Sequence, residues 1–215
     1  MGKRAVRLTA LLAATAALAA CTSPPEPPMG SPGPVLDPQA IAYDNLDFNR
    51  SRNEVFDNTC ETLPKNLSAL LNLQGKPFTP TGGGCFSKEP WGGLSIQLFS
   101  PRSWRKSKQQ YFDDAWNGTN GGGGYFQRSI LLDRYYAVTM ISGEVNQYCT
   151  LTVDTGAEQP FEVQASMDTD ESFRLTKADV DQPIDRAFNE FCPKAKEAAE
   201  KVLPLIDKDG GSRAR

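Results

Sequence analysis

The sequence has no histidine among its 215 residues. Histidine is the usual general base of hydrolases, the usual partner of a catalytic serine or cysteine, and the commonest zinc ligand. Its absence argues against most hydrolases and zinc enzymes, so we expect no catalytic residues, no metal and no cofactor. Glycosidases, however, need only two carboxylates. A histidine-independent, carboxylate-dependent cell-wall or glycan hydrolase is therefore the alternative to a protein that is not an enzyme.

The sequence also lacks an excess of basic residues and any long apolar run beyond its first twenty positions. It has 23 Lys and Arg against 26 Asp and Glu, and without residues 1–20 the balance falls to 20 against 26. Nucleic-acid binding depends on clustered basic residues, so we expect no nucleic-acid partner. No stretch after residue 20 is long and apolar enough to be predicted as a membrane-spanning helix.

The first twenty residues have the pattern of a cleaved signal peptide. Three basic residues within the first seven positions precede an apolar run from Leu8 to Ala20, as in bacterial export signals. The run ends in a Leu-Ala-Ala-Cys motif at Cys21, which resembles the lipobox of bacterial lipoproteins. The resemblance implies cleavage before Cys21 and a diacylglyceryl thioether on its sulfur. We therefore predict a protein held on the extracytoplasmic face of the cell membrane by a lipid anchor at Cys21.

Four cysteines remain once Cys21 is assigned to the lipid. An even number of cysteines in an oxidising compartment predicts two disulfides. Three pairings are possible, and we favour Cys60–Cys85 with Cys149–Cys192 because each joins a predicted helix start to a predicted strand. A four-cysteine zinc site is the competing interpretation, but the paired C-x₂-C spacing typical of such a site is absent.

Composition divides the chain into four parts. Residues 1–20 are the predicted signal peptide. Residues 21–54 hold the lipidated cysteine and a proline-rich stretch, which begins Pro24-Pro25-Glu26-Pro27-Pro28 and has too few apolar residues to fold, so they are predicted to be a disordered linker or arm. Residues 55–206 have the size of a single domain. Residues 207–215 are predicted to be a frayed tail.

The apolar pattern of residues 55–206 predicts an α+β domain. Four strand patterns follow one another after residue 124, and their short connections leave no room for parallel crossovers. We therefore predict a mainly antiparallel sheet of about five to six strands, with the helices packed largely on one face. The predicted helices cover residues 58–73, 103–116, 183–191 and 193–206, and the predicted strands cover residues 85–87, 94–100, 125–132, 135–141, 148–155 and 161–167.

Several short motifs lie where the cysteines meet these elements. They are Phe56-Asp57-Asn58-Thr59-Cys60, Gly84-Cys85-Phe86, Tyr148-Cys149-Thr150-Leu151-Thr152-Val153 and Phe191-Cys192-Pro193. Together with the lipobox they resemble the actinobacterial cell-envelope lipoprotein family that carries a domain of unknown function, and other secreted actinobacterial four-cysteine sensor domains are a second similar group. Phe86 departs from the pattern, in which the aromatic residue comes one position later. The resemblance implies an envelope location and a fold, and it brings no catalytic residues.

Aromatic residues give the one ligand-binding site that the sequence predicts. Trp91, Trp116 and Tyr125 each lie close to glycine, and aromatic side chains beside flexible glycine loops can line a groove for an apolar or glycan ligand. Ordinary packing in the core is the competing interpretation. We therefore expect a non-enzymatic envelope lipoprotein that binds a small ligand, a lipid or glycan, or an envelope protein partner.

The alternative hydrolase would need a pair of carboxylates. The candidates are Asp113 with Asp114, and Asp168 with Asp170 and Glu171. Adjacent Asp residues on a helix point in different directions, and the second group lies in a polar turn. Both groups are therefore interpreted as solvated surface.

We predict that Cys21→Ala releases the protein from the membrane, because the thioether at this position is the only anchor that the sequence predicts. Membrane and soluble fractions of cells that express either form would be separated, and the protein detected in both. Retention of Cys21→Ala in the membrane fraction would show that something other than this cysteine anchors the chain.

Overall fold

The structure is a computed structural model, and it describes residues 52–81, 83–98, 108–118, 125–178 and 184–212. The predicted signal peptide, Cys21 and most of the predicted linker lie outside these ranges. Within the ranges, no helix has the length and apolar character needed to cross a membrane.

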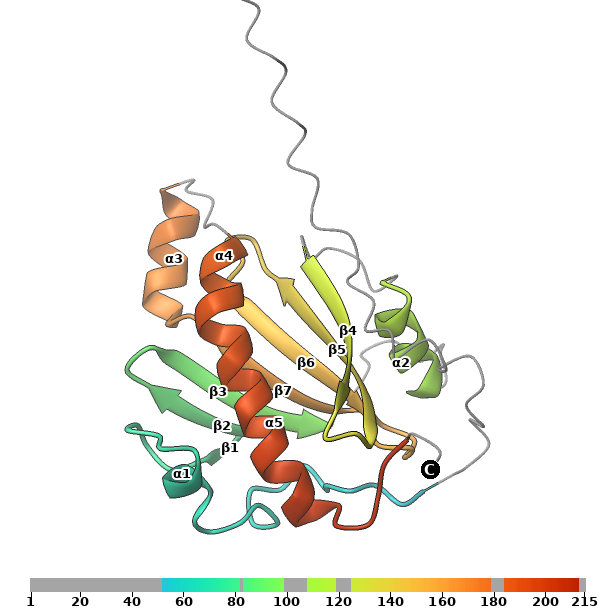
Figure 1. Ribbon diagram of the computed structural model, residues 1–215. Helices are drawn as coiled ribbons and strands as arrows, with labels where there is room; N and C mark the ends of the chain where they lie inside the picture. The colour runs from blue at the N-terminus through green and yellow to red at the C-terminus, as the bar shows by residue number, and fades with distance from the viewer. Residues whose placement is uncertain (1–51, 82, 99–107, 119–124, 179–183, 213–215) are drawn as a thin grey trace, which may run out of the picture. The chain divides into compact units, whose positions relative to one another are not determined.

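The domain is built on one seven-stranded antiparallel sheet (Figure 1). This is somewhat more than the five to six strands predicted, because β1 has only three residues, all exposed, and shows no alternation of apolar and polar side chains. The strands are β1 (Thr79–Thr81), β2 (Gly84–Glu89), β3 (Gly92–Leu98), β4 (Tyr125–Leu131), β5 (Tyr135–Ser142), β6 (Tyr148–Asp154) and β7 (Phe161–Ser166).

The strand order is β1-β2-β3-β7-β6-β5-β4, and every neighbouring pair is antiparallel. Strands β4 to β7 form the consecutive antiparallel series that the short connections predict. The hairpin of β2 and β3 joins this series through β3 and β7, with Ile96 opposite Val163. This pairing brings the turn between β2 and β3 next to the end of β7.

The first helix is much shorter than the apolar stripe predicts. A helix is predicted over residues 58–73, but α1 covers only Leu67–Leu70. Asn58 and Asn72 have φ angles of 61° and 52°, which the right-handed helix excludes. The buried leucines of this region are therefore carried mostly by an irregular segment around a single helical turn.

The C-terminal helices run together, although the sequence predicts two helices divided at Pro193. The chain forms α4 (Ile184–Arg186), the π-helical turn η2 (Ala187–Phe191) and α5 (Cys192–Ile206). The N–H of Cys192 donates to the carbonyl of Ala187, five residues back. Pro193 follows this π-helical turn directly, and because it has no N–H to donate to the preceding turn, it lies where the helical hydrogen-bond pattern changes.

One helix, α3 (Thr169–Lys177), is not predicted by the apolar pattern, and none of its residues is buried. Its start is set by Asp168, whose side chain accepts hydrogen bonds from the N–H groups of Asp170 and Glu171. This is the geometry of an N-cap. The polar turn interpreted as solvated surface is therefore the first turn of a helix.

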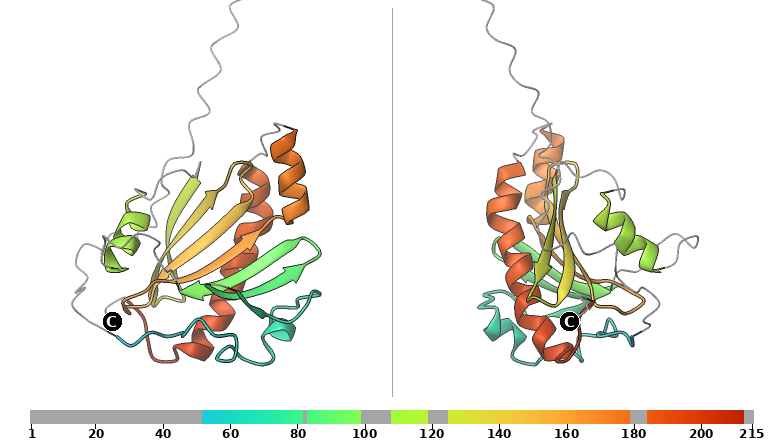
Figure 2. Two further views of the ribbon diagram at one scale, coloured as in Figure 1. Left: turned by 180° about the vertical axis from the view of Figure 1, so that it is seen from behind. Right: turned by 45° about the vertical axis from the view of Figure 1, so that its right-hand side comes forward.

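Helices cover both faces of the sheet (Figure 2). On one face, α5 packs against β6 and β7 through Ala195, Ala198, Ala199, Val202 and Leu203. On the other face, α2 (Lys108–Trp116) packs on β5, with Phe112 and Trp116 against Tyr136 and Val138. The prediction that helices lie largely on one face is right for α1 and α5 and wrong for α2.

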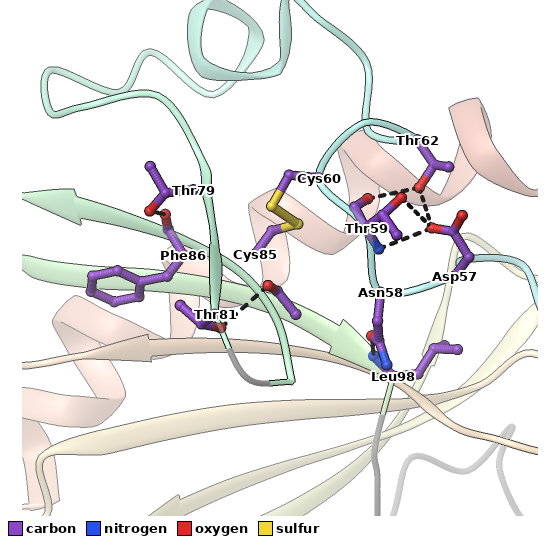
Figure 3. The surroundings of a disulfide bond; sticks show 11 residues. Asp57, Asn58, Thr59, Cys60, Thr62, Thr79, Thr81, Cys85, Phe86 and Leu98 are labelled. Carbon is purple, nitrogen blue, oxygen red and sulfur yellow. Dashed lines mark hydrogen bonds between the residues drawn. A yellow bond between two sulfur atoms is a disulfide. The ribbon is translucent and has the colours of Figure 1, made fainter.

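The structure contains two disulfides, in the pairing that the sequence favours. Cys60–Cys85 joins the segment before α1 to β2, with Cα atoms 5.4 Å apart (Figure 3). Cys149–Cys192 joins β6 to the first residue of α5, with Cα atoms 5.2 Å apart. Cys85 and Cys149 both belong to the main core, so each disulfide fixes a flanking segment to the same face of the sheet.

Arg52 and Asp207 hold the two ends of the described domain together. The Arg52 guanidinium donates to the Asp207 carboxylate at 2.6 and 3.1 Å, and the Tyr135 hydroxyl donates to it at 3.0 Å. The Asp207 side chain is 5% exposed, and Arg134 donates to its main-chain carbonyl at 2.6 Å. These bonds hold Asp207 and Arg52 in the domain, although the sequence assigns them to the tail and to the linker, and residues 213–215 of the predicted tail lie outside the described residues.

We expect Arg52→Ala to lower the free energy of unfolding by about 2 kcal/mol, because it leaves the buried Asp207 carboxylate without its cation. Chemical denaturation followed by circular dichroism measures the change. Lys196→Ala is the matched control, since it breaks only an exposed pair with Glu200 at 3.8 Å and should cost less than about 0.5 kcal/mol. Equal losses in the two variants would contradict the stabilising role of the Arg52–Asp207 pair.

Candidate functional site

The three aromatic residues predicted to bind a ligand lie in three different surroundings. Trp116 is 4% exposed and packs edge-on against Tyr136, with ring centroids 5.5 Å apart. Tyr125 is 8% exposed and packs against Phe188 at 5.2 Å. Trp91, by contrast, is half-buried and lines two hollows. Of the three, Trp91 is therefore the residue that a ligand can reach.

The carboxylates considered for hydrolysis are not brought together. Asp168 caps α3, and hydrogen bonds from main-chain N–H groups lower its pKa. Glu171 forms an ion pair with Arg186 at 2.8 Å, which joins α3 to α4. Asp113 and Asp114 belong to α2, which lies away from α3 in both Figure 1 and Figure 2. Asp168 and Glu171 therefore have structural partners, and Asp113 and Asp114 lie on a helix away from them.

Two neighbouring hollows surround Trp91, and we call them together the Trp91 hollow. The larger has a volume of about 290 Å³ and lies between the loop after α1 and the β2–β3 turn, lined by Asn72, Gln74, Glu89, Pro90 and Trp91. The smaller, of about 130 Å³, lies between the same loop and α5, and its walls include Asn72, Leu73, Trp91, Leu94, Lys194 and Glu197. Asn72 and Trp91 belong to both.

The Trp91 ring is held by two residues near the start of α5. It packs on the Phe191 ring with centroids 6.4 Å apart, and the Lys194 ammonium lies 5.0 Å from its centroid, within the range of a cation–π interaction. Lys194 also donates to the Glu190 carbonyl at 3.1 Å. Trp91 therefore presents an aromatic surface in a defined position, with a positive charge beside it.

The turn that carries Trp91 requires glycine at the next position. Gly92 has a φ angle of 142°, and a Cβ atom there would overlap the carbonyl oxygen of Ser166 in β7. A side chain is therefore excluded both by the backbone conformation and by the close approach of β7. This constraint fixes the path of the turn and so the position of Trp91.

Glu89 anchors the opposite wall of the Trp91 hollow. It is 3% exposed, and one of its carboxylate oxygens accepts from the N–H groups of Gln74 and Gly75, each at 3.0 Å. The other oxygen accepts from the Ser87 hydroxyl at 2.7 Å. Sequence reasoning missed Glu89, although its alternation with Cys85 and Ser87 along β2 is a signal that it faces inward. The single proton of the Ser87 hydroxyl is shared between Glu89 and the Lys76 carbonyl, which lies at the same distance of 2.7 Å, and together these contacts make Glu89 the residue that holds the loop.

The Trp91 hollow combines an aromatic ring with hydrogen-bonding groups. The amides of Asn72 and Gln74 are exposed, as is the carboxylate of Glu197, and Lys194 is half-buried. Together they offer both donors and acceptors. In the described part of the chain, no group of three or more His, Cys, Asp or Glu side chains could hold a metal ion.

The α2 side of the sheet carries two carboxyl groups with raised pKa values. Glu162 of β7 is 6% exposed and accepts from the Gln97 amide at 3.1 Å and the Thr152 hydroxyl at 3.0 Å. Burial raises the pKa of Glu162. Burial, together with the charge of Asp113, raises the pKa of Asp154 to about 6. Both groups therefore cost stability when they ionise.

No protein-family model, no curated protein and no solved structure matches the chain. The resemblance to envelope lipoproteins thus depends on the motifs of the sequence alone. The function has to be argued from the geometry of the site.

Asp154→Asn should remove a pH dependence of stability. The folded-state pKa of Asp154 is raised from 3.8 to about 6, so its contribution to stability falls as the pH rises from about 4 to about 6. The free energy of unfolding of the variant, relative to that of the native protein, should therefore be higher at about pH 7.5 than at about pH 4, by up to about 2 kcal/mol. Urea denaturation at both pH values measures this gain. A stability difference that does not change with pH would contradict the raised pKa.

Proposed function

We propose that this protein is a lipid-anchored envelope lipoprotein whose domain binds a saccharide in the Trp91 hollow without changing it chemically. The observation that carries the proposal is the half-buried Trp91 ring, which Phe191 and Lys194 hold beside the exposed amides of Asn72 and Gln74. This arrangement unites an aromatic surface with polar groups at one place on the surface.

The chemistry of the hollow matches that of a sugar ring. A sugar has an apolar C–H face, which an aromatic ring can cover, and hydroxyl groups that both donate and accept hydrogen bonds. Asn72 and Gln74 can serve as donors and acceptors, whereas Lys194 donates and Glu197 accepts. The volume of about 290 Å³ lies near the lower end of small-molecule sites, which span roughly 300 to 1,000 Å³. A short saccharide therefore fits better than a lipid chain.

The hydrolase alternative has less support at this site. Its two nearest carboxylates both have structural partners: Glu89 accepts from Gln74, Gly75 and Ser87, and Glu197 pairs with Lys201 at 2.6 Å. A glycosidase needs one carboxyl group free to give a proton and a second free to act as base or nucleophile. The contacts of Glu89 and Glu197 therefore favour a binding site over a hydrolytic one.

The proposed setting is the outer face of the cell membrane. The lipobox-like motif at Cys21 supplies the anchor, and the proline-rich stretch after it would act as an extended spacer. The two disulfides of the domain agree with an oxidising compartment. In this position the domain would meet envelope glycans, lipids and proteins, and we expect it to meet no nucleic acid.

Trp91→Ala should weaken saccharide binding by up to about tenfold, because a stacked aromatic ring contributes up to about 1.5 kcal/mol. Isothermal titration calorimetry would measure binding to oligosaccharides of glucose, mannose, arabinose and N-acetylglucosamine. Tyr148→Ala is the matched control, since Tyr148 is an aromatic residue of β6 that is 36% exposed and lies outside the lining of the Trp91 hollow.

Two results would contradict the proposal. One is the absence of binding to every saccharide of the panel by the native protein, and the other is equal weakening by both substitutions. Chromatography of the saccharides after incubation separates binding from hydrolysis, because only hydrolysis releases shorter products.

A further inference from the structure

A third hollow lies beside the Cys60–Cys85 disulfide. Its volume is about 410 Å³, and its walls include Cys60, Glu61, Lys65, Ser68 and Phe78. These residues come from the segment around α1 and from the chain that leads into β1. The volume is that of a small-molecule site, and one wall is a covalent bond that can react.

The two cysteines of this disulfide are not equally accessible. Cys85 is 0% exposed, on the core face of β2, whereas Cys60 is half-buried and lines the hollow. Figure 3 shows Cys60 on the loop whose Asp57 carboxylate accepts from Thr59 and Thr62. A nucleophile in the hollow therefore reaches Cys60 and not Cys85.

Lys65 and Glu61 both line this hollow and are exposed, so its wall carries one positive and one negative charge. Thiolates, not thiols, attack disulfides, and a nearby cation favours the thiolate. The hollow thus places Lys65 beside the disulfide residue that a thiolate would attack, while Glu61 opposes part of its attraction.

We propose that Cys60–Cys85 is a thiol-exchange site, where a small thiol enters this hollow and becomes attached to Cys60. The thiolate sulfur attacks Cys60 Sγ and forms a new S–S bond, while the bond to Cys85 Sγ breaks. The electron pair leaves on Cys85 Sγ, which then takes up a proton. One thiol is consumed and one is formed, so the step needs no other oxidant or reductant.

The second disulfide provides a comparison within the same molecule. Cys149 is 0% exposed and Cys192, like Cys60, is half-buried, but neither Cys149 nor Cys192 lines any of the three hollows described above. Cys149–Cys192 lies between β6 and the start of α5, and Cys192 packs against the main core as Cys60 does. The difference between the two disulfides is the hollow beside Cys60, so Cys149–Cys192 exchanges more slowly while the protein stays folded.

Thiol exchange at Cys60–Cys85 would also change the wall of the Trp91 hollow. The segment that begins at Cys60 continues through α1 to Asn72 and Gln74, which line the Trp91 hollow. Opening the disulfide removes the covalent link at the start of this segment, while Glu89 still holds its end. Attachment of a thiol to Cys60 therefore weakens saccharide binding, a consequence that rests on the proposed function, whereas the exchange itself does not.

Peptide mapping tests the exchange directly. The folded, full mature protein is incubated with L-cysteine, its free thiols are blocked with N-ethylmaleimide in denaturant, and its peptides are mapped by mass spectrometry without reduction. The expected product carries cysteine on Cys60 and the blocking group on Cys85, with Cys149–Cys192 intact. The rate rises with pH as more of the added cysteine becomes thiolate. No attachment, attachment at another cysteine, or opening of both disulfides together would overturn the proposal.

Two lysine variants test the role of charge. Lys65→Gln should slow the attachment about threefold, since one unit charge near the attacking thiolate is lost. Lys76→Gln removes a lysine that is equally exposed but does not line the hollow, and its rate should equal that of the native protein. Equal rates for the two variants would refute the part assigned to Lys65. If the native protein binds no saccharide, these exchange rates are still expected. The proposed saccharide binding and the proposed thiol exchange can therefore be refuted independently.

Discussion

The contact between α5 and the centre of the sheet is the interaction on which the rest of the structure depends. Alanines at positions 195, 198 and 199 are all buried, and their small side chains let the helix approach β6 and β7 closely. The Cys149–Cys192 disulfide fixes the first residue of α5 to β6, and such a crosslink contributes about 3 to 4 kcal/mol in the chain-entropy description. Because Lys194 and Phe191 lie at this end of the helix and hold Trp91, the position of the candidate site follows from this packing.

The segment from Cys60 to Phe78 is held in place by a crosslink and hydrogen bonds more than by regular secondary structure. Its regular structure is a single helical turn, α1, and it is held at one end by a disulfide and at the other by the buried carboxylate of Glu89. Hollows lie on both sides of it. Its leucines at positions 63, 67 and 71 are buried in the main core. At Trp91, the regular helix α5 therefore meets a mostly irregular wall that is anchored in the core.

The sequence predicts the parts of this fold that depend on local patterns. Strands β4 to β7 follow from alternation and short connections, and the cysteine pairing follows from the junctions at which the cysteines lie. The predicted helix over residues 58–73 is wrong because Asn58 and Asn72 have positive φ angles. The spacing of the leucines, on which the prediction depends, does not reveal these backbone conformations. A nearby glycine is the sequence feature that predicts a ligand-binding role for Trp91, Trp116 and Tyr125 alike. Their different burial depends on the pairing of β3 with β7 and on the packing of α2, which are contacts between distant parts of the chain.

The Arg52–Asp207 pair decides where a pulling force would enter the domain. A tether attached upstream of Arg52 would transmit part of its load through this ion pair to the end of α5 and to Tyr135 of β5, and so into the main core. In Figure 1 the start of the described chain, in blue, and the turn between β2 and β3 lie on opposite sides of the sheet. A domain suspended in this way would hold the proposed saccharide site, the Trp91 hollow, away from the point of attachment and open to whatever passes through the envelope.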